Sequence, residues 1–185
     1  MNWYHKRTLG DVLEEAANKF GNRNALIFND ASWTYEEFNR ETDKVAKSLL
    51  AIGVANGEHV AVWMTNRPEW LFLMFAIARV GGCIVPLNTR YRTDDLAYTV
   101  AQSESASLIA LAESGPISYQ EMLAKSIDDI SFTSKNELSI SNYPKLKRII
   151  IHGEVAISGA LSWEDFLNEG QAISDEDLKS RIKEV

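Results

Sequence analysis

Residues 59–87 read HVAVWMTNRPEWLFLMFAIARVGGCIVPL, and their pattern decides the fold. The first six residues form a short run with apolar side chains on both faces, which is typical of a parallel strand covered by helices. Residues 68–80 follow as a helix that is apolar nearly all round and therefore buried. Gly81 and Gly82 end this helix, and 83–87 is a second strand. The segment therefore predicts a strand–helix–strand unit.

The flanking sequence continues the alternation of helix and strand. The residue patterns predict helices at 8–21, at 34–53, from Thr93 onward, at 118–126, at 162–170 and at 175–185, and strands at 24–30, 107–112 and 145–153. Asn29-Asp30 is expected to turn a hairpin between 24–30 and the following residues. The Ser/Asn-rich segment 127–144 is expected to be a loop or an insertion.

Polar residues stand at the predicted helix starts. Thr8 with Asp11, and Thr34 with Glu37, have the spacing of a capping box. The other expected caps are Thr65 or Asn66, before the helix 68–80, and Thr93, before the next helix.

Short connections between alternating strands and helices predict an α/β fold with a doubly wound, mostly parallel sheet flanked by helices. At 185 residues the chain suits one α/β domain, 1–185. Residues 8–112 carry the clear α/β core, and 113–185 are an extension with a weaker pattern. A fold of this size buries enough surface to need no disulfide or structural metal.

The composition excludes several classes of partner. A formal net charge of −7 argues against nucleic acid, which is bound through a basic face, and against an anionic membrane surface. The longest apolar stretch, 70–80, is about half of the roughly 20 residues needed to span a bilayer. Residues 1–10 carry no hydrophobic signal region, so we expect a soluble, cytoplasmic protein. Cys83, the single cysteine, is expected to be a buried, inert thiol.

Motifs of common catalytic sites are missing. The sequence has no G-x-x-x-x-G-K-[ST], G-x-G-x-x-G, G-x-S-x-G or H-E-x-x-H. His5, His59 and His152 are scattered, and we interpret the last two as hydrogen-bonded residues at strand ends rather than bases or ligands. The residues alone therefore predict no catalytic group and no metal site. Three tryptophans, Trp33, Trp63 and Trp70, are expected to pack in the core.

Three pieces within 26–110 nevertheless form a recognisable series. They are TYEEF (34–38), GVANGEHVAVWMTNRPEW (53–70) and RVGGCIVPLNTRYRTDDLAY (79–98). Their order and spacing resemble the N-terminal part of AMP-forming acyl-CoA synthetases. This family belongs to the adenylate-forming superfamily, with firefly luciferase and the adenylation domains of peptide synthetases. Beyond residue 115 the resemblance is fainter, although YPKLKRIIIHG (143–153) suits the next strand.

The resemblance implies a two-step reaction for the whole enzyme. A small carboxylic acid, fatty or otherwise hydrophobic, attacks ATP to give an acyl-adenylate, and coenzyme A then displaces AMP. ATP, Mg²⁺ and coenzyme A are the implied cofactors. The family's phosphate loop, ribose-binding acid and catalytic lysine match nothing in 1–185. We therefore expect this chain to be the first part of such an enzyme, inactive alone and binding no cofactor tightly.

The resemblance carries over one binding residue, Arg90. Some relatives have Asn-Pro-Arg after this strand, and their arginine contacts the phosphate of coenzyme A. Here the stretch reads Asn88-Thr89-Arg90, so the arginine matches and the proline does not. A guanidinium suits phosphate through its paired N–H donors. In the alternative interpretation, Arg90 pairs with Asp94, Asp95 or solvent. Asn88 is expected to be a turn amide that bonds to the backbone.

Two other readings of the chain remain open. It could be a free-standing, non-catalytic α/β module for interaction or ligand binding. A flavodoxin-like nucleotide binder is disfavoured, because no predicted strand is followed by a phosphate-cradling loop. An incomplete fold leaves apolar surface uncovered, so we expect self-association into a homo-oligomer.

Overall fold

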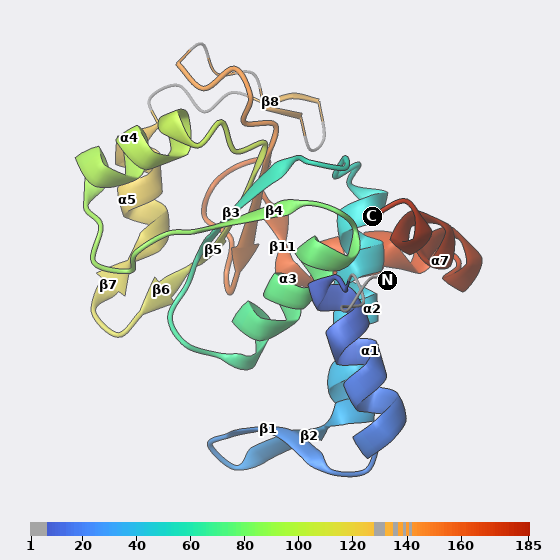
Figure 1. The fold of residues 1–185 in the computed structure, drawn as a ribbon. Helices are drawn as coiled ribbons and strands as arrows, with labels where there is room; N and C mark the ends of the chain where they lie inside the picture. Colours follow the sequence, from blue (N-terminus) through green and yellow to red (C-terminus); the bar gives the residue numbers. More distant parts are fainter. Residues whose placement is uncertain (1–6, 128–131, 135–136, 139, 141) are drawn as a thin grey trace.

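The computed structural model describes residues 7–127, 132–134, 137–138, 140 and 142–185 (Figure 1). His5 lies outside the described residues, as does part of the predicted loop 127–144. Five parallel strands form the central sheet, in the order β11 (Leu161–Ser162), β10 (Arg148–His152), β5 (Ser107–Leu111), β3 (His59–Trp63) and β4 (Cys83–Pro86). In the central register, Ile109 pairs with Val62 on one side and Ile150 on the other. The parallel sheet confirms the predicted fold class.

The order of the strands defines a switch point in the sheet. The first strand of the central sheet along the sequence is β3. The chain then moves outward to β4 and returns to β5 on the other side of β3. It then continues outward to β10 and β11. The direction therefore reverses between β3 and β5. In open parallel sheets, the crevice outside the carboxyl ends of the strands at such a point is where ligands bind.

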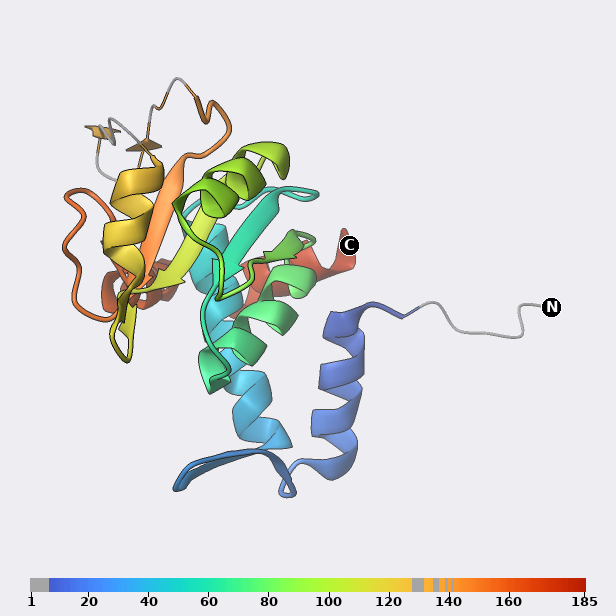
Figure 2. The same ribbon diagram turned by 90° about the vertical axis from the view of Figure 1, so that its left-hand side faces the viewer.

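Helices cover both faces of the sheet (Figures 1 and 2). On one face, α4 (Thr93–Gln102) packs against α5 (Tyr119–Ser126), and α5 contacts β5. On the other face, α2 (Tyr35–Ala51) packs against α3 (Pro68–Arg79). Around α2 lie α1 (Leu9–Phe20), α6 (Trp163–Glu169), the 3₁₀ helix η1 (Gly170–Ala172) and α7 (Asp175–Lys183).

Hairpins decorate this core. The predicted hairpin is confirmed as β1 (Asn24–Phe28) and β2 (Ala31–Thr34), and it projects beyond the ends of α1 and α2 (Figure 1). Asn29 turns it with a positive φ of 51°, a conformation that asparagine tolerates. In the described residues, β6 (Glu113–Ser114) also pairs antiparallel with β7 (Ile117–Ser118), and β8 (Phe132–Ser134) with β9 (Glu137–Leu138).

The tryptophans pack as predicted. Trp63 is fully buried, and its ring meets Tyr119 edge-on with centroids 4.5 Å apart. Trp33 contacts Phe72 at 5.9 Å, and Trp70 is half-buried against the core. Such edge-on aromatic pairs stabilise beyond the area that they bury. The Trp63–Tyr119 pair thus joins β3 to the start of α5.

Capping was predicted correctly for two helices and wrongly for two. Thr8 with Asp11 and Thr34 with Glu37 form capping boxes, as predicted. The cap of α3 is Arg67, not Thr65 or Asn66, because extended backbone at Arg67 leads directly into Pro68, which has no N–H to satisfy. The cap of α4 is Arg92, not Thr93: an Asp95 carboxylate oxygen accepts the Arg92 N–H at 3.1 Å and fixes the helix start one residue earlier.

Cys83 is exposed, so the prediction of a buried thiol was wrong. Cys83 is the first residue of β4, and β4 is the edge strand of the sheet. An edge strand lacks a neighbour on one side, so an apolar sequence around it does not ensure burial.

None of the helices in the described part of the chain has the length and apolar character needed to cross a bilayer.

Candidate functional site

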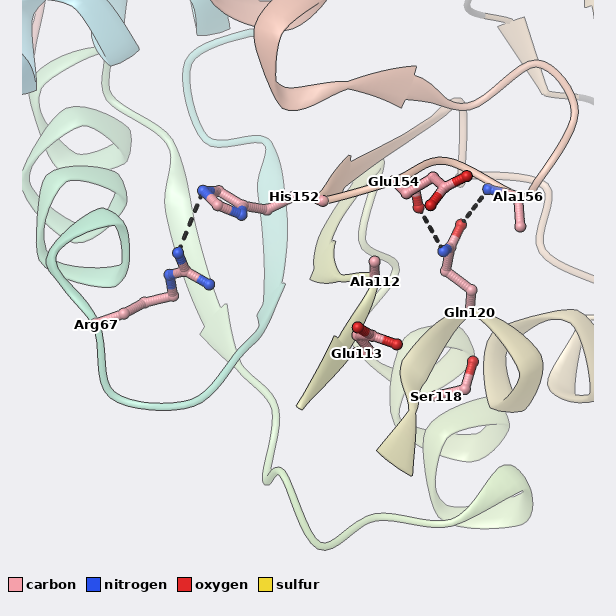
Figure 3. A pocket seen from close by; sticks show the side chains of 9 residues that line it. Arg67, Ala112, Glu113, Ser118, Gln120, His152, Glu154 and Ala156 are labelled. Carbon is pink, nitrogen blue, oxygen red and sulfur yellow. Dashed lines mark hydrogen bonds between the residues drawn. The ribbon is translucent and has the colours of Figure 1, made fainter. Parts of the chain in front are cut away.

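A pocket of about 370 Å³ opens at the carboxyl ends of the strands, beside the switch point (Figure 3). Three strand ends supply its walls: Arg67 follows β3, Ala112 and Glu113 follow β5, and His152 ends β10. The other lining residues are Ser118, Gln120, Gly153, Glu154 and Ala156. The pocket lies where the topology predicts a ligand site, and most of its lining is polar.

At one wall of the pocket, Arg67 and His152 line the cavity and form a cluster with Glu69 behind them. Arg67 Nε donates to a Glu69 carboxylate oxygen at 2.7 Å. His152 Nε2 lies 3.4 Å from Arg67 Nη2 and 3.5 Å from the other Glu69 oxygen. All three side chains are between a fifth and a third exposed, so the cluster is partly shielded from solvent, while Arg67 and His152 face the pocket.

This cluster perturbs the ionisation of Glu69. Burial alone would raise the pKa of Glu69, but hydrogen bonds from His152 and Arg67 outweigh it and lower that pKa from 4.5 to about 2. The Glu69 carboxylate is therefore charged throughout the physiological range. A permanent anion next to Arg67 partly neutralises the guanidinium at the wall of the pocket.

The opposite wall is held by Gln120 in the first turn of α5. Its Nε2 donates to the Glu154 carbonyl at 2.7 Å, and its Oε1 accepts the Ala156 N–H at 2.7 Å (Figure 3). Gln120 is only 8% exposed. Its amide gives these two backbone groups the hydrogen-bond partners that water would otherwise provide. One amide side chain thus fixes the loop that follows β10.

Hydrogen bonds join the elements at the floor of the pocket. The Ala112 carbonyl accepts the N–H groups of Tyr119 and Gln120 at 3.0 and 3.3 Å, which joins the end of β5 to α5. Burial raises the pKa of the Tyr119 phenol. Trp63 Nε1 donates to the Asn88 carbonyl at 3.1 Å, which ties the segment after β4 to the same edge of the sheet.

The sequence model of the family named AMP-binding enzyme matches residues 13–176, most of the chain. The chain belongs to the AMP-binding enzyme family. The match includes every strand of the central sheet and all the lining residues of the pocket.

Curated relatives of this chain carry the names of acyl-CoA synthetases and CoA ligases. YngI of Bacillus subtilis, whose name assigns it to the acyl-CoA synthetases, is 31% identical over 96% of this chain and 33% of its own length. The acyl-CoA ligase sidI of Aspergillus fumigatus is 29% identical over 96% of this chain and 29% of its own. The crotonobetaine/carnitine–CoA ligase of Citrobacter koseri is 28% identical over 76% and 29%, respectively. The chain therefore spans about a third of the length of these relatives.

Solved structures share the fold. The anthranilate CoA ligase AuaEII, in complex with anthranoyl-AMP, superposes with a TM-score of 0.72 at 25% identity, over 88% of this chain and 28% of that one. The N-terminal domain of FACL13 from Mycobacterium tuberculosis superposes with a TM-score of 0.68 at 20% identity, over 91% and 37%. The second likeness concerns the fold alone.

Arg90 lies outside the pocket lining, in the turn after β4. It is exposed, and within the described residues its guanidinium forms no ion pair with Asp94 or Asp95. Asn88 is a turn amide, as predicted: its Oδ1 accepts the Arg90 N–H at 3.0 Å. Arg90 therefore does not pair with Asp94 or Asp95 in this geometry. Its side chain is free for solvent or for a ligand.

Sequence reasoning missed Arg67, Glu69 and Gln120. Ligands bind at the carboxyl ends of parallel strands, and this rule selects Arg67 and His152, because both follow or end correctly predicted strands. Gln120 had no such signal, since its role depends on the approach of α5 to a loop 34 residues away. In the described part of the chain, no cluster of three or more His, Cys, Asp or Glu side chains could hold a metal ion.

Proposed function

We propose that this chain is the N-terminal part of an AMP-forming acyl-CoA ligase. The observation that carries the proposal is the similarity to YngI over 96% of the chain at 31% identity. The matching solved structure with a bound adenylate, AuaEII with anthranoyl-AMP, supports an acyl-adenylate as the intermediate. Curated relatives named as CoA ligases support the thioester as the product.

In the proposed reaction, a substrate carboxylate oxygen attacks the α-phosphorus of ATP and pyrophosphate leaves. The thiol of coenzyme A then attacks the carbonyl carbon of the acyl-adenylate, and AMP leaves with the bonding electron pair. The substrate is a small carboxylic acid. Glu113 and Glu154 are the only carboxylates among the described lining residues. No step is assigned to a metal held by this chain.

The 185-residue chain is proposed to be inactive alone. Adenylation requires groups that cradle the triphosphate and stabilise the charge developing at the α-phosphorus. The Gly/Ser/Thr-rich phosphate loop of this reaction is absent from the sequence. The pocket at the switch point is therefore proposed as one wall of the complete site, with Arg90 contributing to the phosphate of coenzyme A.

A chimera tests the function. In it, this chain replaces the matching third of YngI, and acid-dependent pyrophosphate release and acyl-CoA formation are measured with a panel of carboxylic acids. We expect both activities in the chimera and in YngI, and neither in the 185-residue chain. A folded chimera that forms no acyl-CoA would contradict the proposed function. Pyrophosphate release by the 185-residue chain would contradict the proposal that it is inactive alone.

A further inference from the structure

The ring of His152 packs against an aromatic neighbour, and its Nε2 faces two competing hydrogen-bond partners. It packs against the Trp163 ring with centroids 5.3 Å apart, and Trp163 packs in turn on the buried Phe166 at 5.2 Å. The aromatic packing from α6 directs Nε2 toward the start of α3. There the same nitrogen faces Arg67 Nη2 at 3.4 Å and a Glu69 oxygen at 3.5 Å.

One nitrogen cannot serve both partners at once. When Nε2 carries no proton, it accepts a hydrogen bond from Arg67 and cannot donate to Glu69. When Nε2 carries the proton, it donates to Glu69 and its lone pair is no longer available to Arg67. The two similar distances describe one ring position that suits either arrangement. The tautomer of His152 is therefore tied to the hydrogen bonding of Arg67.

Arg67 is the cation that a ligand in the pocket would meet. Among the described residues that line the pocket, it is the only lysine or arginine. Its Nε is engaged by Glu69, while its terminal nitrogens have no partner in the described residues except His152. Glu113 and Glu154 stand across the pocket, so a negatively charged group is favoured at the Arg67 side alone (Figure 3).

We propose that Arg67 binds an anionic group of the ligand, a carboxylate or a phosphoryl group, and that His152 controls the availability of Arg67. With Nε2 unprotonated, His152 holds Arg67 against the wall. With Nε2 protonated, His152 turns its hydrogen bond to Glu69 and leaves Arg67 Nη2 to the anion. The choice of a carboxylate or phosphoryl ligand rests on the proposed ligase function; the coupling itself does not.

Linkage makes the coupling measurable from either end. If release of Arg67 favours anion binding, then anion binding must favour the Nε2–H tautomer by the same factor. Removing the Arg67 guanidinium must act in the same direction as an anion, because both deprive Nε2 of its donor. Removing the Glu69 carboxylate must act in the opposite direction, because it takes away the acceptor for Nε2–H.

Nitrogen-15 NMR of the histidine rings tests this in the 185-residue chain, at about pH 8, which is above the pKa of histidine in model peptides. Arg67→Met and Glu69→Met form a matched pair. We expect Arg67→Met to raise the Nε2–H population of His152 at least twofold, and Glu69→Met to lower it by a similar factor. The His59 ring, bonded through Nδ1 to the Ser103 carbonyl at 2.6 Å, reports that each variant is folded. Unchanged His152 signals in both variants, with His59 intact, would overturn the coupling.

The ligand is tested by adding butyrate or inorganic phosphate to the wild-type chain and to Arg67→Met. We expect a saturable shift toward Nε2–H in the wild type and none in Arg67→Met. A response to butyrate assigns the site to a substrate carboxylate, and a response to phosphate alone assigns it to a phosphoryl group. A response to neither overturns the anion site. Loss of acyl-CoA formation in the chimera, with this response intact, would overturn the proposed function and leave the inference standing.

Discussion

Gly153 lines the pocket in a backbone conformation that other residues rarely adopt. It follows β10 with a φ of 121°, in the region that side chains rarely adopt. A Cβ added there would lie 2.8 Å from the Ala112 Cβ, at the end of the neighbouring strand. The close approach of these two strand ends shapes the pocket, so position 153 requires glycine for both its conformation and its space.

Gly153→Ala should destabilise the protein by about 3 kcal/mol, through backbone strain and the contact with Ala112. Gly115→Ala is the matched control, because Gly115 has a φ of 57° with open space around its missing Cβ. It should cost only about 1 kcal/mol. Urea unfolding measures both free energies. Equal losses in the two variants would contradict the close approach of the strand ends.

Glu69 predicts how stability depends on pH. Its folded-state pKa of about 2 lies below the ordinary 4.5, so the unfolded chain binds more protons between these values. The stabilisation is fully present above about pH 5 and is lost as the pH falls toward 2. Glu69→Gln should therefore be less stable by about 2 kcal/mol at neutral pH, with the difference shrinking in acid.

Unfolding free energies of wild type and Glu69→Gln, measured from about pH 7 down to the acid limit of folding, check this. Glu164→Gln, at an exposed position of α6, controls for the loss of one negative charge. A Glu69→Gln difference that stays constant across the range, or grows in acid, would show that the carboxylate is not held by Arg67 and His152.

Arg90 carries a prediction for the proposed enzyme. In the YngI chimera, Arg90→Met should raise the KM for coenzyme A roughly three- to fivefold, the effect of one exposed charge pair, and leave the KM for ATP unchanged. Arg40→Met is the control, because Arg40 is a surface arginine of α2 paired with Glu36 at 3.2 Å. Steady-state kinetics distinguish them. An unchanged KM for coenzyme A would remove Arg90 from the site.

At the scale of elements, Gln120 joins the start of α5 to the loop after β10. Gln120→Met keeps the side-chain length but leaves the Glu154 carbonyl and the Ala156 N–H without their partner. We expect a loss of about 1–2 kcal/mol in stability and faster hydrogen exchange at Ala156. Amides of β5 should keep their protection.

Gln171→Met serves as the matched control, because among the described residues the Gln171 side chain bonds only to Asn168, at the surface, at 3.0 Å. Its exchange pattern should match the wild type throughout. Hydrogen exchange followed by NMR resolves the individual amides. If Ala156 exchanged at the wild-type rate in Gln120→Met, the loop would owe its position to something other than the amide clamp.

The elements and the site were not equally predictable from the sequence. Runs such as HVAVW and RIIIH predicted buried parallel strands, since apolar residues on both faces have few other uses. Helix starts were predictable where the sequence contains a capping box, as at Thr34. The cap at Arg67 was not predicted, because it is set by the following residue, Pro68. The prediction that Cys83 is buried failed because local sequence does not reveal the order of the strands, and that order decides which strand lies at the edge. Gln120 failed because its partners are distant in sequence.

At the scale of the whole molecule, the sheet brings three strand ends to one polar pocket at its switch point. Helices seal both faces, so the carboxyl edge is where the topology predicts chemistry. That edge offers Arg67, His152 and two glutamates, but the sequence provides no loop that wraps a triphosphate. We propose that this chain forms a wall of an adenylating site without the residues that hold the nucleotide.

Isothermal titration calorimetry of MgATP into the 185-residue chain tests that claim most directly, with YngI as the positive control. The account predicts no saturable heat from the 185-residue chain and ordinary saturable binding by YngI. Saturable, magnesium-dependent binding of ATP to the 185-residue chain would contradict it.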